Sequence, residues 1–222
     1  MAINIFDVQN EAPKVTYDVV GRFHAGHTIN KRPQSLQEWR VTSDDKDILE
    51  SISKEFGGTV QEWDNEKQPF EVFTDATAVD VVVEKIFSSM ILWGRNGVIR
   101  KCDGLTISYP EEQAGQPCPT CSTAPDLATR KQMAQQGTGC QPDVTIRFRL
   151  KGFEDLGVFE FKSGSWNLAQ DIGKSEAALE KFGGKAVGTL TLEPVEWVQK
   201  STGQTRRFVK SVLNLTGPAD KE

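Results

Sequence analysis

The chain has 222 residues and a formal net charge of −5, with 37% hydrophobic and 26% charged residues. This composition is typical of a globular protein with a sizeable core and excludes a disordered chain. The longest apolar run, around 86–93, is too short to span a membrane, and residues 1–11 do not resemble a secretory signal, so we expect a cytoplasmic protein without membrane contact. The lack of a large basic excess disfavours broad binding to duplex DNA, but a small basic groove stays open.

Acidic residues concentrate in one region. Residues 41–90 carry four basic and twelve acidic side chains, a net charge of −8, whereas 1–40 and 91–222 have net charges of +1 and +2. We interpret the acidic region as a solvated face, with contact to a basic protein surface as the alternative.

The sequence pattern of the N-terminal half predicts short strands and one helix. A strand over 17–23 precedes a loop marked by Gly26, Asn30 and Pro33 and a short extended segment at 39–42. Ser43 is expected to cap a helix over 44–56, which the pair Gly57-Gly58 ends. Further strands are predicted at 70–74 and 78–84, followed by a hairpin of 90–93 and 98–100 around Asn96-Gly97.

The C-terminal part shows a clearer β pattern. Apolar and polar residues alternate over 144–151, which predicts a half-buried strand with a cationic outer face that includes Arg147 and Arg149. The remaining pattern predicts a strand at 158–161, a helix over 165–181, and strands at 187–198 and 206–215 joined by a turn at 201–203.

These elements predict an α+β fold. We expect a mainly antiparallel β-sheet, or a partly open barrel like the oligonucleotide/oligosaccharide-binding (OB) type, with two helices and a cysteine-rich zinc-binding insertion. Residues 1–101 and 143–216 would form two parts of a single core, 102–142 the insertion, and 217–222 a flexible tail.

All four cysteines lie in the insertion, with the spacing C-x15-C-x2-C-x18-C: Cys102, Cys118, Cys121 and Cys140. Four thiolates satisfy a closed, structural Zn²⁺ site, and a reducing cytosol argues against two disulfides. The insertion has few apolar residues, so bound zinc would supply the order that packing cannot, about 10–16 kcal/mol. The alternatives are a redox C-x-x-C motif or unrelated reduced thiols.

Catalytic patterns are weak in this sequence. His24 and His27, the only two histidines, fall in the expected loop, where a polar loop pair is preferred over a metal site. Gly173-Lys174-Ser175 lacks the first glycine of a P-loop and falls inside a predicted helix. We therefore expect a protein that is not an enzyme.

Tryptophan and arginine occur close together at two positions, Trp39-Arg40 and Trp93-Gly94-Arg95. Such pairs could stack on and neutralise single-stranded nucleic acid, or anchor a protein partner. The alternative for each is ordinary core or surface packing.

Several blocks, taken in order, resemble the actinobacteriophage recombination directionality factors that partner large serine integrases. They are Ile5-Phe6-Asp7, Val20-Gly21-Arg22-Phe23, Arg32-Pro33-Gln34-Ser35-Leu36-Gln37-Glu38-Trp39-Arg40-Val41-Thr42, Glu71-Val72-Phe73-Thr74, Leu92-Trp93-Gly94-Arg95, Cys102-Asp103-Gly104, Gly137-Thr138-Gly139-Cys140, Gly157-Val158-Phe159 and Ser165-Trp166.

The resemblance implies a function through protein contact. Such a factor binds its integrase, changes how the coiled-coil arms pair, and switches recombination from integration to prophage excision in the cytoplasm of the bacterial host. It implies no catalysis by the factor and only indirect contact with DNA, through the integrase. Trp39, Arg40, Trp93 and Arg95 are our candidate partner contacts. The alternative function is a phage single-stranded-DNA-binding or replication accessory protein that uses the cationic strand at 147–151.

Overall fold

The computed structural model describes residues 18–29, 32–124, 126–199 and 203–219. Three α-helices lie within these ranges: α1 (Lys46–Phe56), α2 (Leu127–Gln135) and α3 (Trp166–Lys181), with short 3-10 turns at Glu111–Gln113 and Glu154–Leu156. The strands are β1 (Val19–Ile29), β2 (Arg32–Ser43), β3 (Val60–Glu62), β4 (Phe70–Phe73), β5 (Ala78–Gly94), β6 (Gly97–Cys102), β7 (Ile107–Tyr109), β8 (Gln141–Leu150), β9 (Val158–Ser163), β10 (Ala186–Val198) and β11 (Thr205–Pro218).

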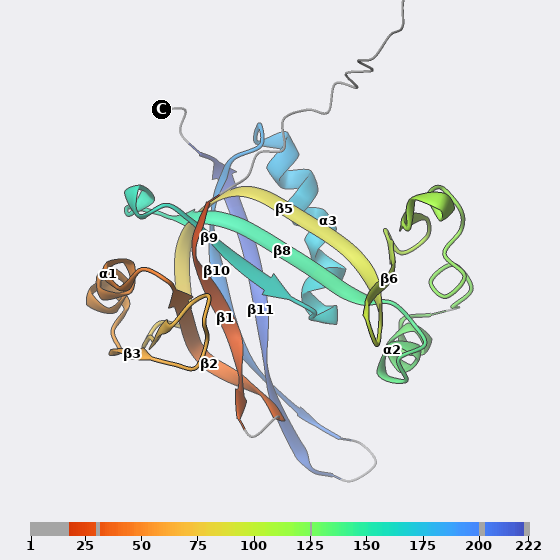
Figure 1. Ribbon diagram of the computed structural model, residues 1–222, viewed down its shortest axis with the longest axis horizontal. Coiled ribbons are helices and arrows are strands. Elements are labelled where there is room, and N and C mark those ends of the chain that lie inside the picture. Colours follow the sequence, from red (N-terminus) through yellow and green to blue (C-terminus); the bar gives the residue numbers. More distant parts are fainter. Residues whose placement is uncertain (1–17, 30–31, 125, 200–202, 220–222) are drawn as a thin grey trace, which may run out of the picture.

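The eleven strands form one sheet in the order β11-β10-β5-β8-β9-β1-β2-β4-β3, while β6 extends from β5 and β7 from β6. Among the described strands, β1 and β9 pair in parallel and the other pairs are antiparallel. The sheet curls into a half-barrel, with α2 and the cysteine-bearing loops gathered at one end (Figure 1). The predicted α+β class, with a mainly antiparallel, partly open sheet, is confirmed.

The alternation predicted for 144–151 places one face of β8 in the core. Val144, Ile146, Phe148 and Leu150 are buried, and the core cluster that contains them also contains Leu168, Ile172 and Leu179 of α3. Because strand side chains alternate between faces, Thr145, Arg147 and Arg149 point to the opposite side of the sheet from α3. This outer face is therefore polar.

Aromatic rings fill the centre of the core. Phe23 of β1 meets Trp39, Phe148 and Phe159 edge to face, with ring centroids 5.4–5.7 Å apart. Trp39 also meets Phe161 edge to face at 5.2 Å. These contacts join β1, β2, β8 and β9, and each adds about 0.5–1.5 kcal/mol beyond area burial.

The prediction of a loop around Gly26, Asn30 and Pro33 is wrong. β1 continues to Ile29 and β2 starts at Arg32, so the two strands form one long hairpin, in which Thr28 pairs with Pro33. Proline is tolerated there because β2 pairs with β4 only over Arg40–Ser43, which leaves Pro33 on a stretch that needs no second partner. Gly26 marks a register shift within β1, which explains the loop-like signal.

Other boundaries also move. β5 is a single strand where two were expected, because Lys85 to Ser89, polar in part, pair along β8. The helix cap is Asp45, whose carboxylate accepts from the N–H of Asp47 at 2.9 Å, while the Ser43 hydroxyl donates to the carbonyl of Val20. β11 extends through Pro218 into the expected tail, and residues 220–222, like Tyr17 of the first predicted strand, lie outside the described residues.

We predict that Phe148→Ala lowers the free energy of unfolding by about 3–5 kcal/mol, because it leaves a cavity among the buried rings. Phe87, on the neighbouring strand β5, is 43% exposed and provides the matched control. Phe87→Ala should cost less than about 1 kcal/mol. Urea unfolding followed by circular dichroism measures both, and equal losses would contradict the placement of the core.

Candidate metal centre

The four cysteines, far apart in sequence, meet at the end of the sheet. Cys102 ends β6, Cys118 and Cys121 lie in the loop before α2, and Cys140 directly precedes β8. All four are at most 2% exposed, and their sulfur atoms lie within 4.8 Å of one another. The expectation that these residues form one cluster is therefore confirmed.

The sulfur positions match those around a tetrahedral ion. Sγ of Cys102 lies 3.6 Å from Sγ of Cys121 and 4.0 Å from Sγ of Cys140, and Sγ of Cys118 lies 3.9 Å from Sγ of Cys140. Metal–sulfur bonds of about 2.3 Å place the corners of a tetrahedron about 3.8 Å apart. A disulfide requires about 2.05 Å, and all four cysteines are free thiols. The four residues could thus hold one metal ion.

Local turns aim the sulfur atoms inward. The Asp103 carboxylate accepts from the backbone N–H groups of Leu105 and Thr106 at 2.8 and 2.7 Å, which folds the turn after Cys102. Arg130 of α2 donates to the carbonyl oxygen of Cys121 at 2.7 Å and so ties the helix to the C-x-x-C segment. The Thr120 hydroxyl lies 3.4 Å from Sγ of Cys140 and provides a polar neighbour to the sulfur cluster.

Hydrogen bonds within the cluster shift the pKa values of two thiols in opposite directions. Hydrogen bonds to Cys121 and Cys140, together with burial, raise the pKa of Cys102. Hydrogen bonds from Cys102 and Cys121 lower the pKa of Cys140. The thiols therefore ionise unequally, because a protonated thiol that donates a hydrogen bond stabilises the thiolate that accepts it. A divalent cation removes this restriction by balancing the thiolate charges.

The cluster joins the insertion to the main sheet. Cys102 pairs with Met90 of β5, and Met90 also pairs with Pro142 of β8. The cysteines and Ile107 form a second buried cluster, separate from the main core, against which Met90 and Leu92 pack. Cysteines are thus four of the five buried residues in this cluster.

Of the four predicted partner contacts, the structure places two in the interior. Trp39 is fully buried among the core rings, and Arg40 is 4% exposed. Nε of Arg40 donates to the Glu71 carboxylate at 2.6 Å, and its guanidinium lies 4.2 Å from the centroid of the Trp63 ring. A partner cannot touch these two side chains in this conformation, so their packing explains them.

The other two lie at the surface, on the β5–β6 hairpin. Trp93 is 46% exposed, and Arg95 is exposed in the turn. The turn follows the predicted Asn96-Gly97 signal, with Gly94 paired to Gly97. The hairpin begins beside Cys102, so the sulfur cluster lies at its base.

His24 and His27 lie in β1 rather than in a loop. Nε2 of His24 lies 2.8 Å from the hydroxyl of Thr42, and the His27 ring meets Phe73 edge to face. Burial, then the positive charges of Arg40 and Arg22, lower the pKa of His24 to about 4. His24 is thus a neutral, hydrogen-bonded residue of the sheet.

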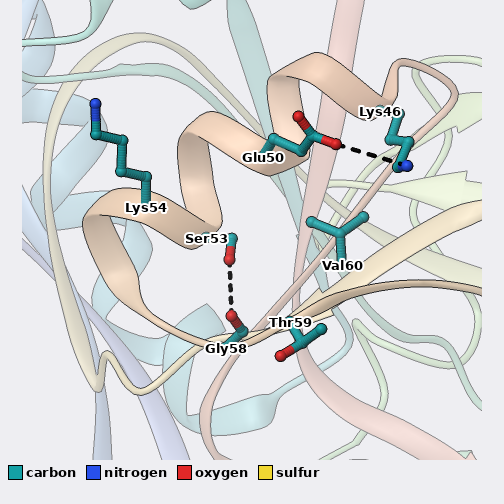
Figure 2. Close-up of a pocket in the computed structure, with 7 residues that line it drawn as sticks. All are labelled: Lys46, Glu50, Ser53, Lys54, Gly58, Thr59 and Val60. Carbon is teal, nitrogen blue, oxygen red and sulfur yellow. Dashed lines mark hydrogen bonds and ion pairs between the residues drawn. The ribbon is translucent and has the colours of Figure 1, made fainter.

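A shallow hollow of about 430 Å³ lies between α1 and β3 (Figure 2). Its polar groups interact with one another: Lys46 pairs with Glu50 at 3.6 Å, and the Ser53 hydroxyl donates to the carbonyl of Gly58 at 2.7 Å. These pairings are typical of a solvated surface.

Within the described residues, no helix is long and apolar enough to cross a bilayer.

The fold and the cysteine cluster define a curled β-sheet protein whose insertion gathers four buried cysteines. Residues 20–216 match the family model described as "Gp3-like: Recombination directionality factor-like". The match covers most of the chain, so the protein belongs to this recombination directionality factor-like family, which confirms the resemblance drawn from its sequence blocks. No solved structure matches the chain.

We predict that elemental analysis of the purified protein finds one metal ion per chain. Cys118→Ser should abolish binding and make the region 102–140 sensitive to protease, because the sulfur cluster makes up most of its core. Thr123→Ala, which removes a nearby exposed hydroxyl bonded to the carbonyl of Pro119, should keep the metal. A metal-free, protease-resistant wild-type protein would contradict the assignment.

We predict that His24 makes the fold less stable in mild acid. Between pH about 6.5 and about 4, the unfolded chain binds a proton at this residue and the folded chain does not, so the free energy of unfolding falls as the pH falls. The loss is on the order of 3 kcal/mol. Urea titrations across this range should show a smaller pH effect in His24→Gln. His27→Gln is the comparison variant: it removes only the smallest of the charges that lower the His24 pKa, so it should keep most of the wild-type pH effect.

Proposed function

We propose that the protein binds a phage large serine integrase and switches it from integration to prophage excision. The match to the recombination directionality factor-like family over residues 20–216 carries this proposal. The integrase serine performs strand cleavage, and this protein acts in the cytoplasm of the bacterial host without a catalytic step of its own. Its target on the integrase is the coiled-coil region, and it reaches the recombining sites as part of the integrase–DNA complex.

The switch requires differential affinity. A factor changes an equilibrium only if it binds one integrase arrangement more tightly than the other. A hundredfold shift needs about 2.7 kcal/mol, which a few anchoring aromatic or arginine side chains can supply. Trp93 and Arg95 combine these side-chain types on one exposed hairpin, so they are the candidate anchors.

The bound metal is Zn²⁺ in this proposal, with a structural role. Four thiolates complete a tetrahedral zinc shell and leave no coordination position for a reacting molecule. The pairing of Met90 with Cys102 places this clamp at the base of the hairpin that carries Trp93. Zinc would therefore hold the proposed anchors in position before the integrase binds, which lowers the entropy lost on docking.

A second exposed tryptophan provides an internal comparison. β10 pairs with β5 only over Ala186–Thr191, and beyond that point β10 and β11 project as a two-stranded arm (bottom of Figure 1). Trp197 on this arm is 48% exposed, almost the same as Trp93. The two residues match in type and exposure but lie on different hairpins.

We predict that Trp93→Ala with Arg95→Ala weakens binding to the integrase of the same phage at least tenfold and reduces excision in parallel. Pull-down with purified integrase and a recombination assay on the hybrid attachment sites measure the two effects. Trp197→Ala, the matched control, should leave both within about twofold, in line with surface substitutions elsewhere.

Loss at Trp197 but not at Trp93 would move the contact to the β10–β11 arm and contradict the hairpin assignment. If the wild-type protein neither binds the integrase nor promotes excision, the proposed function itself is wrong. The metal content of each variant should stay at the wild-type value, which separates a lost contact from a collapsed hairpin.

A further inference from the structure

The outer face of β1, β9, β8 and β5 carries a cross-strand row of charged side chains. In the strand register, Arg22 lies opposite Glu160, Glu160 opposite Arg147, and Arg147 opposite Lys85. The four residues therefore lie side by side across four strands. Strands lie about 4.8 Å apart, so the row spans about 14 Å. A neighbouring row joins Lys162, Thr145 and Phe87.

Cations outnumber acids on this face, which we name the convex face. It comprises three acidic residues, Glu84, Asp143 and Glu160, and six cationic ones, Arg22, Lys85, Arg147, Arg149, Lys162 and Lys185. Lys185 directly precedes β10 and joins this face through its ion pair with Glu84 of β5. Glu160 pairs with both Arg22 and Arg147, and Glu84 with both Arg149 and Lys185. Asp80, one row further along, lies beside Lys151, whose N–H its carbonyl accepts, so this row adds no net charge.

The acids lie deeper than the cations. The Glu84, Asp143 and Glu160 side chains are 7–20% exposed, whereas the cationic side chains that pair with them are 23–64% exposed. An approaching molecule therefore meets ammonium and guanidinium groups first. In a chain of net charge −5, the convex face is a local positive surface.

We propose that the convex face contacts the phosphate backbone of duplex DNA held by the integrase. That the DNA is held by the integrase rests on the proposed function, whereas the argument from charge stands without it. Protein interfaces are depleted of charge at their centre and enriched in apolar residues, whereas DNA interfaces are polar and strongly positive. The centre of this face has cations, with Phe87 as its one large apolar group, flanked by Lys85 and Arg147 at 5.7 and 5.1 Å.

Phosphate contacts of this kind position a protein on DNA without reading its sequence. They would add affinity for the integrase–DNA complex over free integrase, and salt would weaken that added affinity by about 0.9 logarithmic units per contact for each decade of salt. α3 packs on the opposite face of the sheet and leaves the convex face open to such contact.

The test uses the triple variant Lys85→Ala, Lys162→Ala and Lys185→Ala, three exposed lysines of the convex face. The matched control replaces three exposed lysines on α1 and α3, Lys46, Lys54 and Lys181, with alanine and so removes the same charge. Binding is measured to free integrase, to integrase on a hybrid attachment site, and to a short fluorescent duplex alone, between about 50 and 200 mM salt.

We expect wild-type protein to bind the integrase–DNA complex at least tenfold more tightly than free integrase at low salt. The convex-face triple variant should lose this preference and show a salt slope less steep by about 2.7, for three lost contacts. Its affinity for free integrase should stay unchanged, and the α1/α3 control should behave as wild type. Weak, salt-dependent binding of the wild-type protein to the duplex alone should fall in the convex-face variant.

Three results would overturn the inference. They are equal losses in both triple variants, a loss of binding to free integrase in the convex-face variant, and single-stranded DNA binding that exceeds duplex binding and disappears in Phe87→Ala. The last would indicate base stacking. If integrase is not the partner, the duplex-only measurement still decides whether this face binds phosphate, so the two proposals fail separately.

Discussion

The position of one whole end of the molecule depends on four buried sulfur atoms that lie within 4.8 Å of one another. Among the described residues, Ile107 is the only other buried member of that cluster, and Met90 and Leu92 pack against it. Thiols at this spacing can hydrogen-bond to one another, whereas four thiolates here would need a cation to balance their charge. The order of the insertion, and of the β5–β6 hairpin beside it, therefore depends more on these four cysteines than on a large hydrophobic core.

The main core, by contrast, is held together by buried hydrophobic side chains. Some of its elements could be predicted from local sequence patterns and others could not. The alternation in β8 and the apolar stripe of α3 act locally, so both were found from the sequence. The cysteine cluster was found because thiol spacing restricts the chemistry strongly. The β1–β2 hairpin was missed because Gly26 and Pro33 are loop signals that tertiary pairing overrides.

The burial of individual aromatic and charged residues could not be predicted from their neighbours in the sequence. Trp39-Arg40 and Trp93-Gly94-Arg95 look alike in sequence, yet one pair is interior and the other exposed. The difference comes from Glu71 and Trp63, which are distant in sequence and receive the Arg40 guanidinium. Likewise, the excess of cations on the convex face depends on a register of four strands that no local pattern encodes.

The parallel pairing of β1 with β9 has a consequence for synthesis of the chain. Val19 finds its neighbour Val158 only after the ribosome has made both the acidic region and the cysteine-rich insertion. Until then β1, β2, β4 and β3 can form only part of the sheet, in which β1 leaves one edge unpaired. The sheet thus closes late, through a contact of long sequence separation, and the nascent chain must keep that edge from pairing elsewhere while it waits.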